Sequence, residues 1–175
     1  KNPNVNVNYG SDGTGDLYNL ENIKAYTSLF DHDADFVSAD GGFDFSYNFN
    51  KQEQMSYRIL FCEIITALSI QKIGGSFVCK FFDIYTIETI KLLFFLCCFY
   101  DVVYINKPLT SRPANSEKYI VCKGYCKQES VISLMKSCFM NKVDLQIFVP
   151  KTFIKHIKEY NDYYTNEQYT SIQNI

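Results

Sequence analysis

Apolar positions along the chain recur in two ways, at the spacing of a helix and in short unbroken runs. The helical spacing predicts one helix over residues 19–30, with Asn19 as its N-cap, and a longer one over 51–72. The glycines of the KIGG segment are expected to end the second helix as C-cap and turn. Between the two helices, the run over residues 34–40 is typical of a buried strand that ends at Asp40.

The same alternation continues through the middle of the chain. Short apolar runs predict strands over residues 76–82, 101–105 and 117–125, and an apolar helical pattern covers 86–99. Helices that alternate with strands indicate an α/β sheet with helices on both faces. Only a loop joins the last two predicted strands, so we expect them to pair antiparallel.

Both ends of the chain carry weaker patterns. Residues 1–16 predict a loop with at most an edge strand. Towards the other end we expect a helix over 128–139, an extended segment or strand over 143–150, and an amphipathic helix over 151–164. The tyrosine-rich segment EYNDYYTNEQY could stack nucleic-acid bases, but a partly ordered surface is the more common role of such a segment.

Composition narrows the class of protein. A chain of 175 residues with 47% hydrophobic and 17% aromatic residues is globular and long enough for one domain with a core. The net charge of -2 gives no general affinity for polyanions, so any contact with nucleic acid must come from a local group of Lys and Arg. The only arginines are Arg58 and Arg112, and the longest apolar run, 92–99, is far shorter than the ~20 residues of a membrane span.

Cysteine usage indicates a reducing compartment. The seven cysteines are odd in number, and Cys97 and Cys98 are adjacent within an apolar run, as expected of small hydrophobic residues. Cys122 and Cys126 are spaced loosely and no second pair follows, so we predict no metal site. The chain starts without Met in a polar stretch, and we interpret it as a piece of a longer protein.

Three charged residues are predicted to meet at one edge of the sheet. Asp40 ends one strand, Lys80 lies near the end of the next, and Glu117 opens an antiparallel neighbour whose start faces the same edge. Ligands of open α/β sheets bind beyond the carboxyl ends of the parallel strands. A structural salt-bridge network would explain any one of these residues, but three on three strands favour a functional site.

The residue types at this edge suggest proton transfer. A lysine held between two carboxylates can accept or steer a proton from a substrate hydroxyl, and the carboxylates raise its pKa and orient its ammonium. Neither a Ser-His-Asp nor a Cys-His set is evident, so no strong protein nucleophile is implied. His32 lies in a predicted loop and His156 on a predicted helix, where solvated side chains are typical.

Three segments carry a resemblance to a known family: DFVSADGGF, GGSFVCKFFD and KPLTSRPANSEKYIVCKGY. In this order and spacing they resemble the FtsJ-like RNA 2′-O-methyltransferases. Among these, they are most similar to the eukaryotic enzymes that methylate the ribose of the first transcribed nucleotide of capped mRNA. The resemblance runs from about Tyr9 to Tyr125, and more faintly through FVPKTFIK.

The resemblance implies a fold and a division of the chain. The expected fold is a Rossmann-like, S-adenosylmethionine-dependent methyltransferase with a mostly parallel sheet and an antiparallel C-terminal strand. Residues 1–127 would be the C-terminal part of that domain, and residues 128–175 an extension packed on it. The glycine-rich cofactor loop and the first lysine of the family precede these segments, so the N-terminal part of the fold would lie upstream of this chain.

The resemblance also implies roles for single residues. The family uses a Lys-Asp-Lys-Glu tetrad, and Asp40, Lys80 and Glu117 match its second, third and fourth members. Lys80 would be the general base at the 2′-hydroxyl, oriented by the two carboxylates. The implied contacts to S-adenosylmethionine are Asp16, Leu17 and Asp40. Those to capped RNA are Asn50, Lys51, Gln52 and Asn115, with Arg112 and Lys107 as candidates for phosphate.

The expected substrate is the capped 5′ end of mRNA, in the nucleus or alternatively the cytoplasm. RNA polymerase II or the capping machinery would be the protein partners, with no role for DNA or membrane. Two alternatives stay open, a methyltransferase of ribosomal or transfer RNA and an inactive module that binds RNA or a protein partner. The phrase SRPANSEKY favours the cap, and the intact Asp40, Lys80 and Glu117 favour an enzyme.

Overall fold

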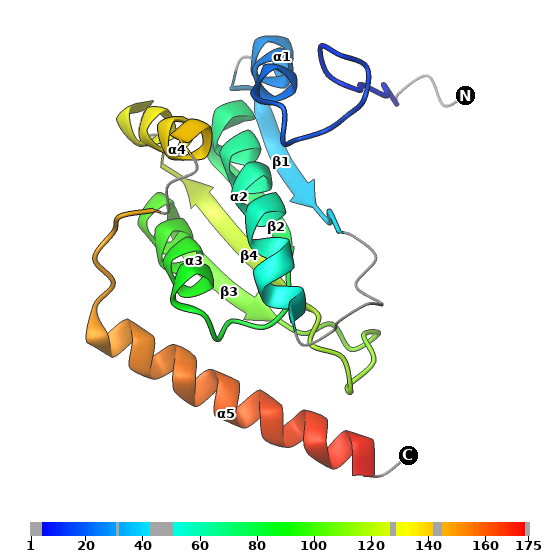
Figure 1. The fold of residues 1–175 in the computed structure, drawn as a ribbon, viewed down its shortest axis with the longest axis vertical. Coiled ribbons are helices and arrows are strands. Elements are labelled where there is room, and N and C mark those ends of the chain that lie inside the picture. Colours follow the sequence, from blue (N-terminus) through cyan, green and yellow to red (C-terminus); the bar gives the residue numbers. More distant parts are fainter. Residues whose placement is uncertain (1–4, 31, 43–50, 127–128, 142–144, 174–175) are drawn as a thin grey trace.

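A four-stranded sheet forms the centre of the molecule (Figure 1). The computed structural model describes residues 5–30, 32–42, 51–126, 129–141 and 145–173. The strands are β1 (Ala34–Ala39), β2 (Gln71–Phe81), β3 (Tyr100–Asn106) and β4 (Lys118–Tyr125), in the order β1-β2-β4-β3. β1 and β2 are parallel, whereas β4 runs antiparallel to both β2 and β3, as predicted for the last two strands.

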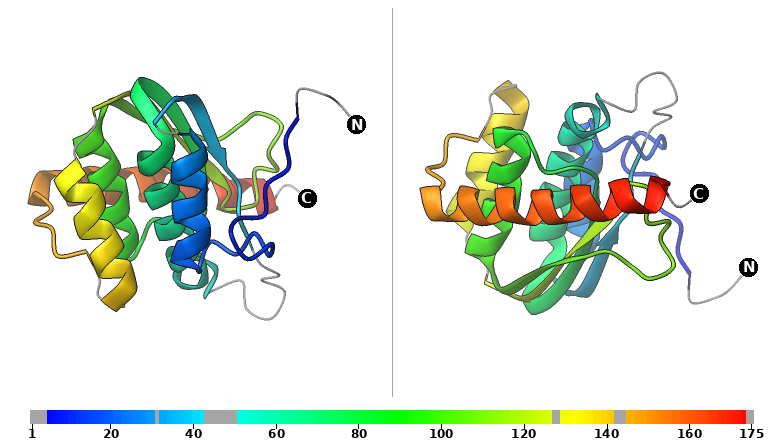
Figure 2. Two further views of the ribbon diagram at one scale, coloured as in Figure 1. Left: turned by 90° about the horizontal axis from the view of Figure 1, so that it is seen from above. Right: turned by 90° about the horizontal axis from the view of Figure 1, so that it is seen from below.

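Helices pack on this sheet and on one another. They are α1 (Leu20–Phe30), α2 (Gln52–Ile70), α3 (Ile87–Phe99), α4 (Glu129–Asn141) and α5 (Lys151–Gln173). α2 and α3 lie against the sheet, α1 and α4 pack on α2, and α5 crosses the lower end of the molecule beside α3 (Figures 1 and 2). The C-terminal end of β2 and the start of β4, which carry the candidate site, lie close to α5.

The core lies between the sheet and its helices because successive side chains of each strand point alternately into the core and away from it. Phe77, Cys79 and Phe81 of β2 and Ile120 and Cys122 of β4 are fully buried, while the residues between them are partly exposed. Burying one large apolar side chain contributes about 1.5–3 kcal/mol relative to leaving it exposed. The same core includes residues of both C-terminal helices: Ile132, Met135 and Ile157.

The position of the helices relative to the sheet differs from the prediction. Helices were predicted on both faces, but α2 and α3 lie on the same side (Figure 2). Both are crossovers that advance in one direction, from β1 to β2 and from β2 to β3, and right-handed crossovers of that kind fall on one face. On the other face, Phe36, Val102 and Tyr104 remain 59%, 40% and 55% exposed.

The KIGG glycines also have a different role from the predicted one. α2 ends at Ile70 and β2 begins at the next residue, Gln71, so the glycines lie inside the strand. The register of β2 against β1 is irregular here, jumping from Gln71 to Ser76. Gly74 has a φ of 81°, which other residues rarely adopt, so it bends the chain out of the ladder instead of capping the helix.

At the chain ends, the loop predicted for the N-terminal region is confirmed over residues 5–16, and the last helix is longer than predicted. Neither residues 5–16 nor residues 145–150 form a strand in the described part of the chain. The last helix, predicted to end at 164, continues to Gln173 because neither Gly nor Pro interrupts it after Pro150. The tyrosine-rich segment is therefore helical. Among the described residues, no helix combines the length and apolar character needed to cross a membrane.

A buried carboxylate ties α2 to the loop after β2. Glu53, in the first turn of α2, is only 8% exposed. Its Oε1 accepts hydrogen bonds from the backbone N–H of Tyr85 (2.9 Å) and Thr86 (2.8 Å) and from the Thr86 hydroxyl (2.9 Å). Thr86 is in turn the N-cap of α3, accepting from the N–H of Thr89. One carboxylate thus sets the path of residues 83–86 below the candidate site.

Replacing Glu53 by Ala should loosen this loop. The substitution removes the protein acceptor of partly buried N–H groups, which costs up to about 1–3 kcal/mol for each group that stays unsatisfied. We expect hydrogen–deuterium exchange of residues 84–87 to become faster in Glu53→Ala, while Glu53→Gln, which keeps an acceptor oxygen, stays close to the wild type. Equal protection of this segment in all three proteins would contradict the assignment.

Candidate active site

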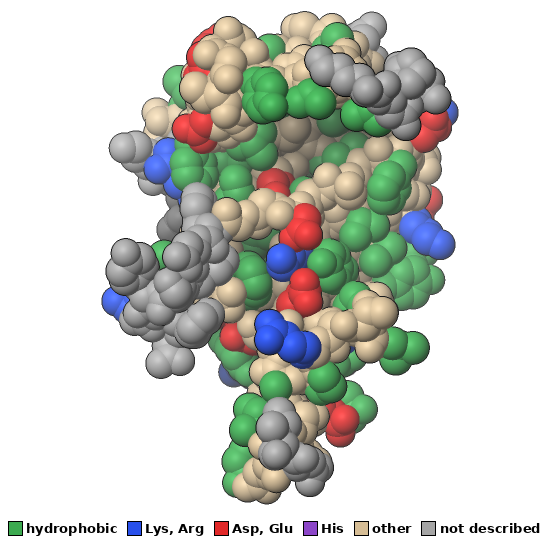
Figure 3. Space-filling view, turned by 90° about the vertical axis from the view of Figure 1, so that its right-hand side faces the viewer, with side chains coloured by type: hydrophobic (Ala, Val, Ile, Leu, Met, Phe, Trp, Pro, Cys, Tyr) green, Lys and Arg blue, Asp and Glu red, His purple; other side chains and the backbone are tan. Residues whose placement is uncertain are grey.

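The structure brings Asp40, Lys80 and Glu117 together at one edge of the sheet. Asp40 follows the last residue of β1, Lys80 is the penultimate residue of β2, and Glu117 precedes the first residue of β4. The Lys80 Nζ lies 2.8 Å from Asp40 Oδ1 and 3.8 Å from Glu117 Oε1. Acidic and basic side chains lie next to one another in the middle of the face that Figure 3 shows.

The charges of this group stabilise one another. The hydrogen bond from Lys80 to Asp40 is the main cause that raises the pKa of Lys80 above its ordinary value. The pKa of Glu117 is lowered, chiefly because the Ser111 hydroxyl donates to Glu117 Oε2 at 2.7 Å and also because Tyr119 donates to Oε1 at 3.0 Å. The site therefore favours the ammonium form of Lys80 and the carboxylate form of Glu117.

The loop between β3 and β4 is organised by a lysine at its start. Lys107 directs its ammonium at the carbonyl oxygens of Asn115 (2.8 Å) and Glu117 (3.0 Å), at the Ser111 hydroxyl (3.1 Å) and at Asn115 Oδ1. Partial burial is the main cause that lowers the pKa of Lys107. Lys107 thus holds residues 111–117 in shape, and its expected contact with a phosphate stays a prediction.

A hollow of about 690 Å³ lies in front of Lys80. It joins the end of β2, the start of α2, the β3–β4 loop and one residue of α5, and it is lined by Gln52, Lys80, Phe82, Asp83, Thr110, Ser111, Arg112, Ala114, Asn115, Ser116, Glu117 and Gln168. Of the expected RNA contacts, Gln52, Arg112 and Asn115 line it. Lys51 is exposed at the N-cap of α2, and Asn50 lies outside the described residues.

The expected cofactor residues Asp16 and Leu17 follow a loop closed around Asn22 of α1. The buried Asn22 amide donates to Asp12 Oδ1 and to the Asp16 carbonyl, both at 2.9 Å. Gly10 has a φ of 78°, and a Cβ at this position would overlap the Asn22 side chain. The next residue, Tyr18, has its ring 4.6 Å from the Arg58 guanidinium, which ties the segment to α2.

Two buried charged residues of the site, Glu63 and Lys118, were not predicted from the sequence. Glu63 of α2 accepts a hydrogen bond from the Gly41 N–H at 2.6 Å and so fixes the chain directly after Asp40; burial is the main cause that raises its pKa. Lys118 is 4% exposed and contacts the Ser116 carbonyl at 3.0 Å and Asp83 Oδ1 at 3.6 Å. The only available signal was a charged residue inside an apolar helix or strand.

The cysteine pair considered as metal ligands does not form a site. Cys122 is buried in the core, whereas Cys126 is exposed and its Sγ lies 3.6 Å from Asp101 Oδ1. In the part of the chain that the structure describes, no group of three or more His, Cys, Asp or Glu residues could hold a metal ion.

A known protein family covers most of this chain. A model of FtsJ-like methyltransferases matches residues 1–125. The chain belongs to the FtsJ-like methyltransferase family. This match ends at the last residue of β4, so α4 and α5 lie beyond the part of the chain that the family model covers.

Curated relatives extend the likeness over more of the chain. Cap-specific mRNA (nucleoside-2′-O-)-methyltransferase 1 of Mus musculus is 39% identical over 179 residues, which cover 94% of this chain. The protein of the same name from Homo sapiens is 37% identical over 181 residues, again 94% of the chain. In both cases the chain spans 21% of the relative's length.

A solved structure supports the FtsJ-like fold. A Plasmodium falciparum protein described as a ribosomal RNA methyltransferase superposes with a TM-score of 0.50 over 71% of this chain and 64% of its own. Its sequence identity of 19% limits this comparison to the fold. The family match and the fold agree with each other.

The protonation of Lys80 can be tested without measuring activity. Acetic anhydride modifies only the neutral amine, so the pH dependence of Lys80 labelling, followed by mass spectrometry, reports its pKa. Because Asp40 stabilises the ammonium, Asp40→Asn should move the labelling curve to lower pH, and Glu117→Gln should move it less. Lys72, paired with Asp35 on the same strand, should not change. An unaltered Lys80 curve in Asp40→Asn would disprove the assigned coupling.

Proposed function

We propose that the protein to which this chain belongs transfers a methyl group from S-adenosylmethionine to the ribose 2′-hydroxyl of the first transcribed nucleotide of capped mRNA. The proposal is carried by one observation, the Lys80 amine held between Asp40 and Glu117 at the wall of a hollow large enough for a nucleotide. The relatives named as cap-specific mRNA 2′-O-methyltransferases support the choice of substrate.

The chain's own contribution to this reaction is positioning and the movement of one proton. S-adenosylmethionine supplies a methyl group that is already electrophilic because it is bound to a sulfonium sulfur. Lys80 would first lose its own proton to solvent and would then accept the 2′-hydroxyl proton, while the ribose oxygen bonds to the methyl carbon and the bond from that carbon to the sulfonium sulfur breaks. Asp40 and Glu117 stabilise the ammonium that results, and Ser111 and Tyr119 keep Glu117 ionised and in place.

The residues present fit part of a cofactor site. Asp40 is 59% exposed in its side chain, so it keeps accepting capacity while one oxygen binds Lys80. Together with Asp16 it would accept hydrogen bonds from the amino and hydroxyl groups of S-adenosylmethionine, for which carboxylate oxygens are suitable acceptors, and Leu17 would supply an apolar contact. The Asn22 network and the Tyr18–Arg58 contact give this segment its shape before any ligand binds.

The RNA would lie in the hollow next to Lys80. Arg112 is exposed on its rim, as suits a contact to phosphate, while Gln52 and Asn115 offer amide groups inside it. The reacting 2′-hydroxyl itself distinguishes RNA from DNA. A nuclear location, with the cytoplasm as alternative, and association with RNA polymerase II or the capping machinery belong to the same proposal.

Replacing Lys80 tests the proposal directly. In the full-length protein, Lys80→Ala should lower methyl transfer to capped RNA by about 10²–10⁴-fold, the usual contribution of a general base. The matched control is Lys72→Ala, which removes an exposed lysine of the same strand and should keep full activity. Transfer is measured with labelled S-adenosylmethionine, and mass mapping identifies the modified ribose.

Three outcomes would contradict the proposal. Full activity of Lys80→Ala would reject Lys80 as the base. Equal methylation of capped and uncapped RNA by the wild-type protein would reject the cap as the recognised feature and favour another class of RNA. Methyl on any position other than the 2′-oxygen of the first nucleotide would reject the assigned site of transfer.

A further inference from the structure

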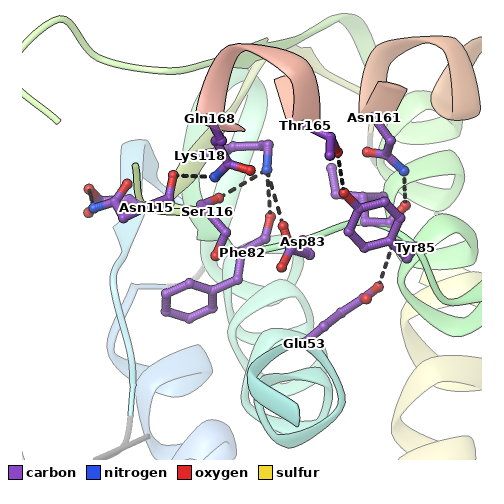
Figure 4. A network of polar contacts seen from close by, with 12 residues as sticks. Glu53, Phe82, Asp83, Tyr85, Asn115, Ser116, Lys118, Asn161, Thr165 and Gln168 are labelled. Carbon is purple, nitrogen blue, oxygen red and sulfur yellow. Dashed lines mark hydrogen bonds and ion pairs between the residues drawn. The ribbon is translucent and has the colours of Figure 1, made fainter. Parts of the chain in front are cut away.

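One face of α5 makes three polar contacts with the loops of the candidate site (Figure 4). Asn161 donates its amide N–H to the Ile84 carbonyl at 2.7 Å, and Thr165 shares a hydrogen bond of 2.7 Å with the Tyr85 hydroxyl. Gln168 donates its amide N–H to the Asn115 carbonyl, also at 2.7 Å. Spacings of four and three residues place these side chains on a single face of the helix.

The first half of α5 is fixed by apolar packing. The Phe153 ring meets the Phe94 ring of α3 edge-on with centroids 5.1 Å apart, and Ile157 is 6% exposed in the core. Further along, Tyr163, Tyr169 and Ile172 are exposed. The polar face, and not apolar burial, therefore holds the second half of α5 against the site.

Gln168 contacts the β3–β4 loop at Asn115, two residues before Glu117. The carbonyl oxygen of Asn115 accepts two hydrogen bonds, one from Lys107 of the same loop and one from Gln168 of α5. The next residue, Ser116, is held from below by Lys118, whose buried ammonium also faces Asp83. Figure 4 shows Gln168 directed at Asn115 and Lys118 at Ser116, so that two neighbouring residues of this short segment are held. The residue that follows is Glu117, the carboxylate beside Lys80.

We infer that α5 forms part of the substrate-positioning apparatus, and that Gln168 is a positioning residue that fixes the β3–β4 loop around the RNA. This inference rests on the proposed function. Gln168 lines the hollow in front of Lys80 together with Arg112 and Asn115, so its loss changes the wall against which the substrate lies. Because α5 lies beyond the span of the family match, its role adds to what the family fold provides.

Different helices support the segments expected to bind RNA and S-adenosylmethionine. α5 packs on α3 and contacts the loops at 84–85 and 115, whereas the Asp16–Leu17 segment is held by α1 and α2. Removing the Gln168 donor should therefore weaken the interaction with RNA and leave that with S-adenosylmethionine intact. A loss of general stability would impair both equally.

The test compares isosteric and control variants of α5 in the full-length protein. Gln168→Glu keeps the size of the side chain but replaces its donor by an acceptor that faces the Asn115 carbonyl. We expect the KM for capped RNA to rise about tenfold, the scale of one lost hydrogen bond. The KM for S-adenosylmethionine should stay unchanged. Gln173→Ala, which removes an amide bonded within the helix to Tyr169, should match the wild type.

Hydrogen–deuterium exchange provides a readout that does not depend on activity. Exchange of residues 109–117 should become faster in Gln168→Glu, while that of residues 76–82 in β2 stays unchanged. Unaltered loop exchange or an unaltered KM for RNA in this variant would overturn the inference. If the wild-type protein failed to methylate capped RNA, the proposed function would fall, and the exchange difference would still decide whether α5 fixes the loop.

Discussion

The ammonium of Lys80 needs two carboxylates that come from distant parts of the chain, and most of the polar structure around it holds them there. The pair with Asp40 is partly exposed, and such pairs contribute only about 0–1 kcal/mol to stability. That is too little to hold two chain segments against their own conformational entropy, which costs about 1–2 kcal/mol per residue. The position of each carboxylate must therefore be fixed by other contacts.

Those contacts are buried charges bound to backbone groups. Glu63 binds the Gly41 N–H beside Asp40, and Lys118 binds the Ser116 carbonyl beside Glu117. Burial is the main cause of both pKa shifts, upward for Glu63 and downward for Lys118, so each charge is costly where it lies. A buried charge adds little to stability compared with an apolar side chain, but it fixes one loop conformation, which a site built on loops requires.

The sequence predicted the four strands and the meeting of Asp40, Lys80 and Glu117 because both follow from local patterns. Strand periodicity and the direction of each strand determine which residues end at one edge. The supporting contacts depend instead on side-chain direction and on tertiary packing. Nothing local indicates that Lys107 turns into its own loop, or that Gln168 reaches a carbonyl more than fifty residues earlier. The bulge at Gly74 likewise depends on pairing with another strand.

The candidate site consists of two halves that meet at Lys80. On one side, α1 and α2 shape the segment around Asp16 through Asn22 and Arg58; on the other, α5 and Lys118 hold the loop that ends at Glu117. Glu63 lies where the halves meet, because it contacts Cys79 of β2 as well as Gly41. Since different helices support each half, the β3–β4 loop can change while the geometry of Asp40 and Lys80 is maintained.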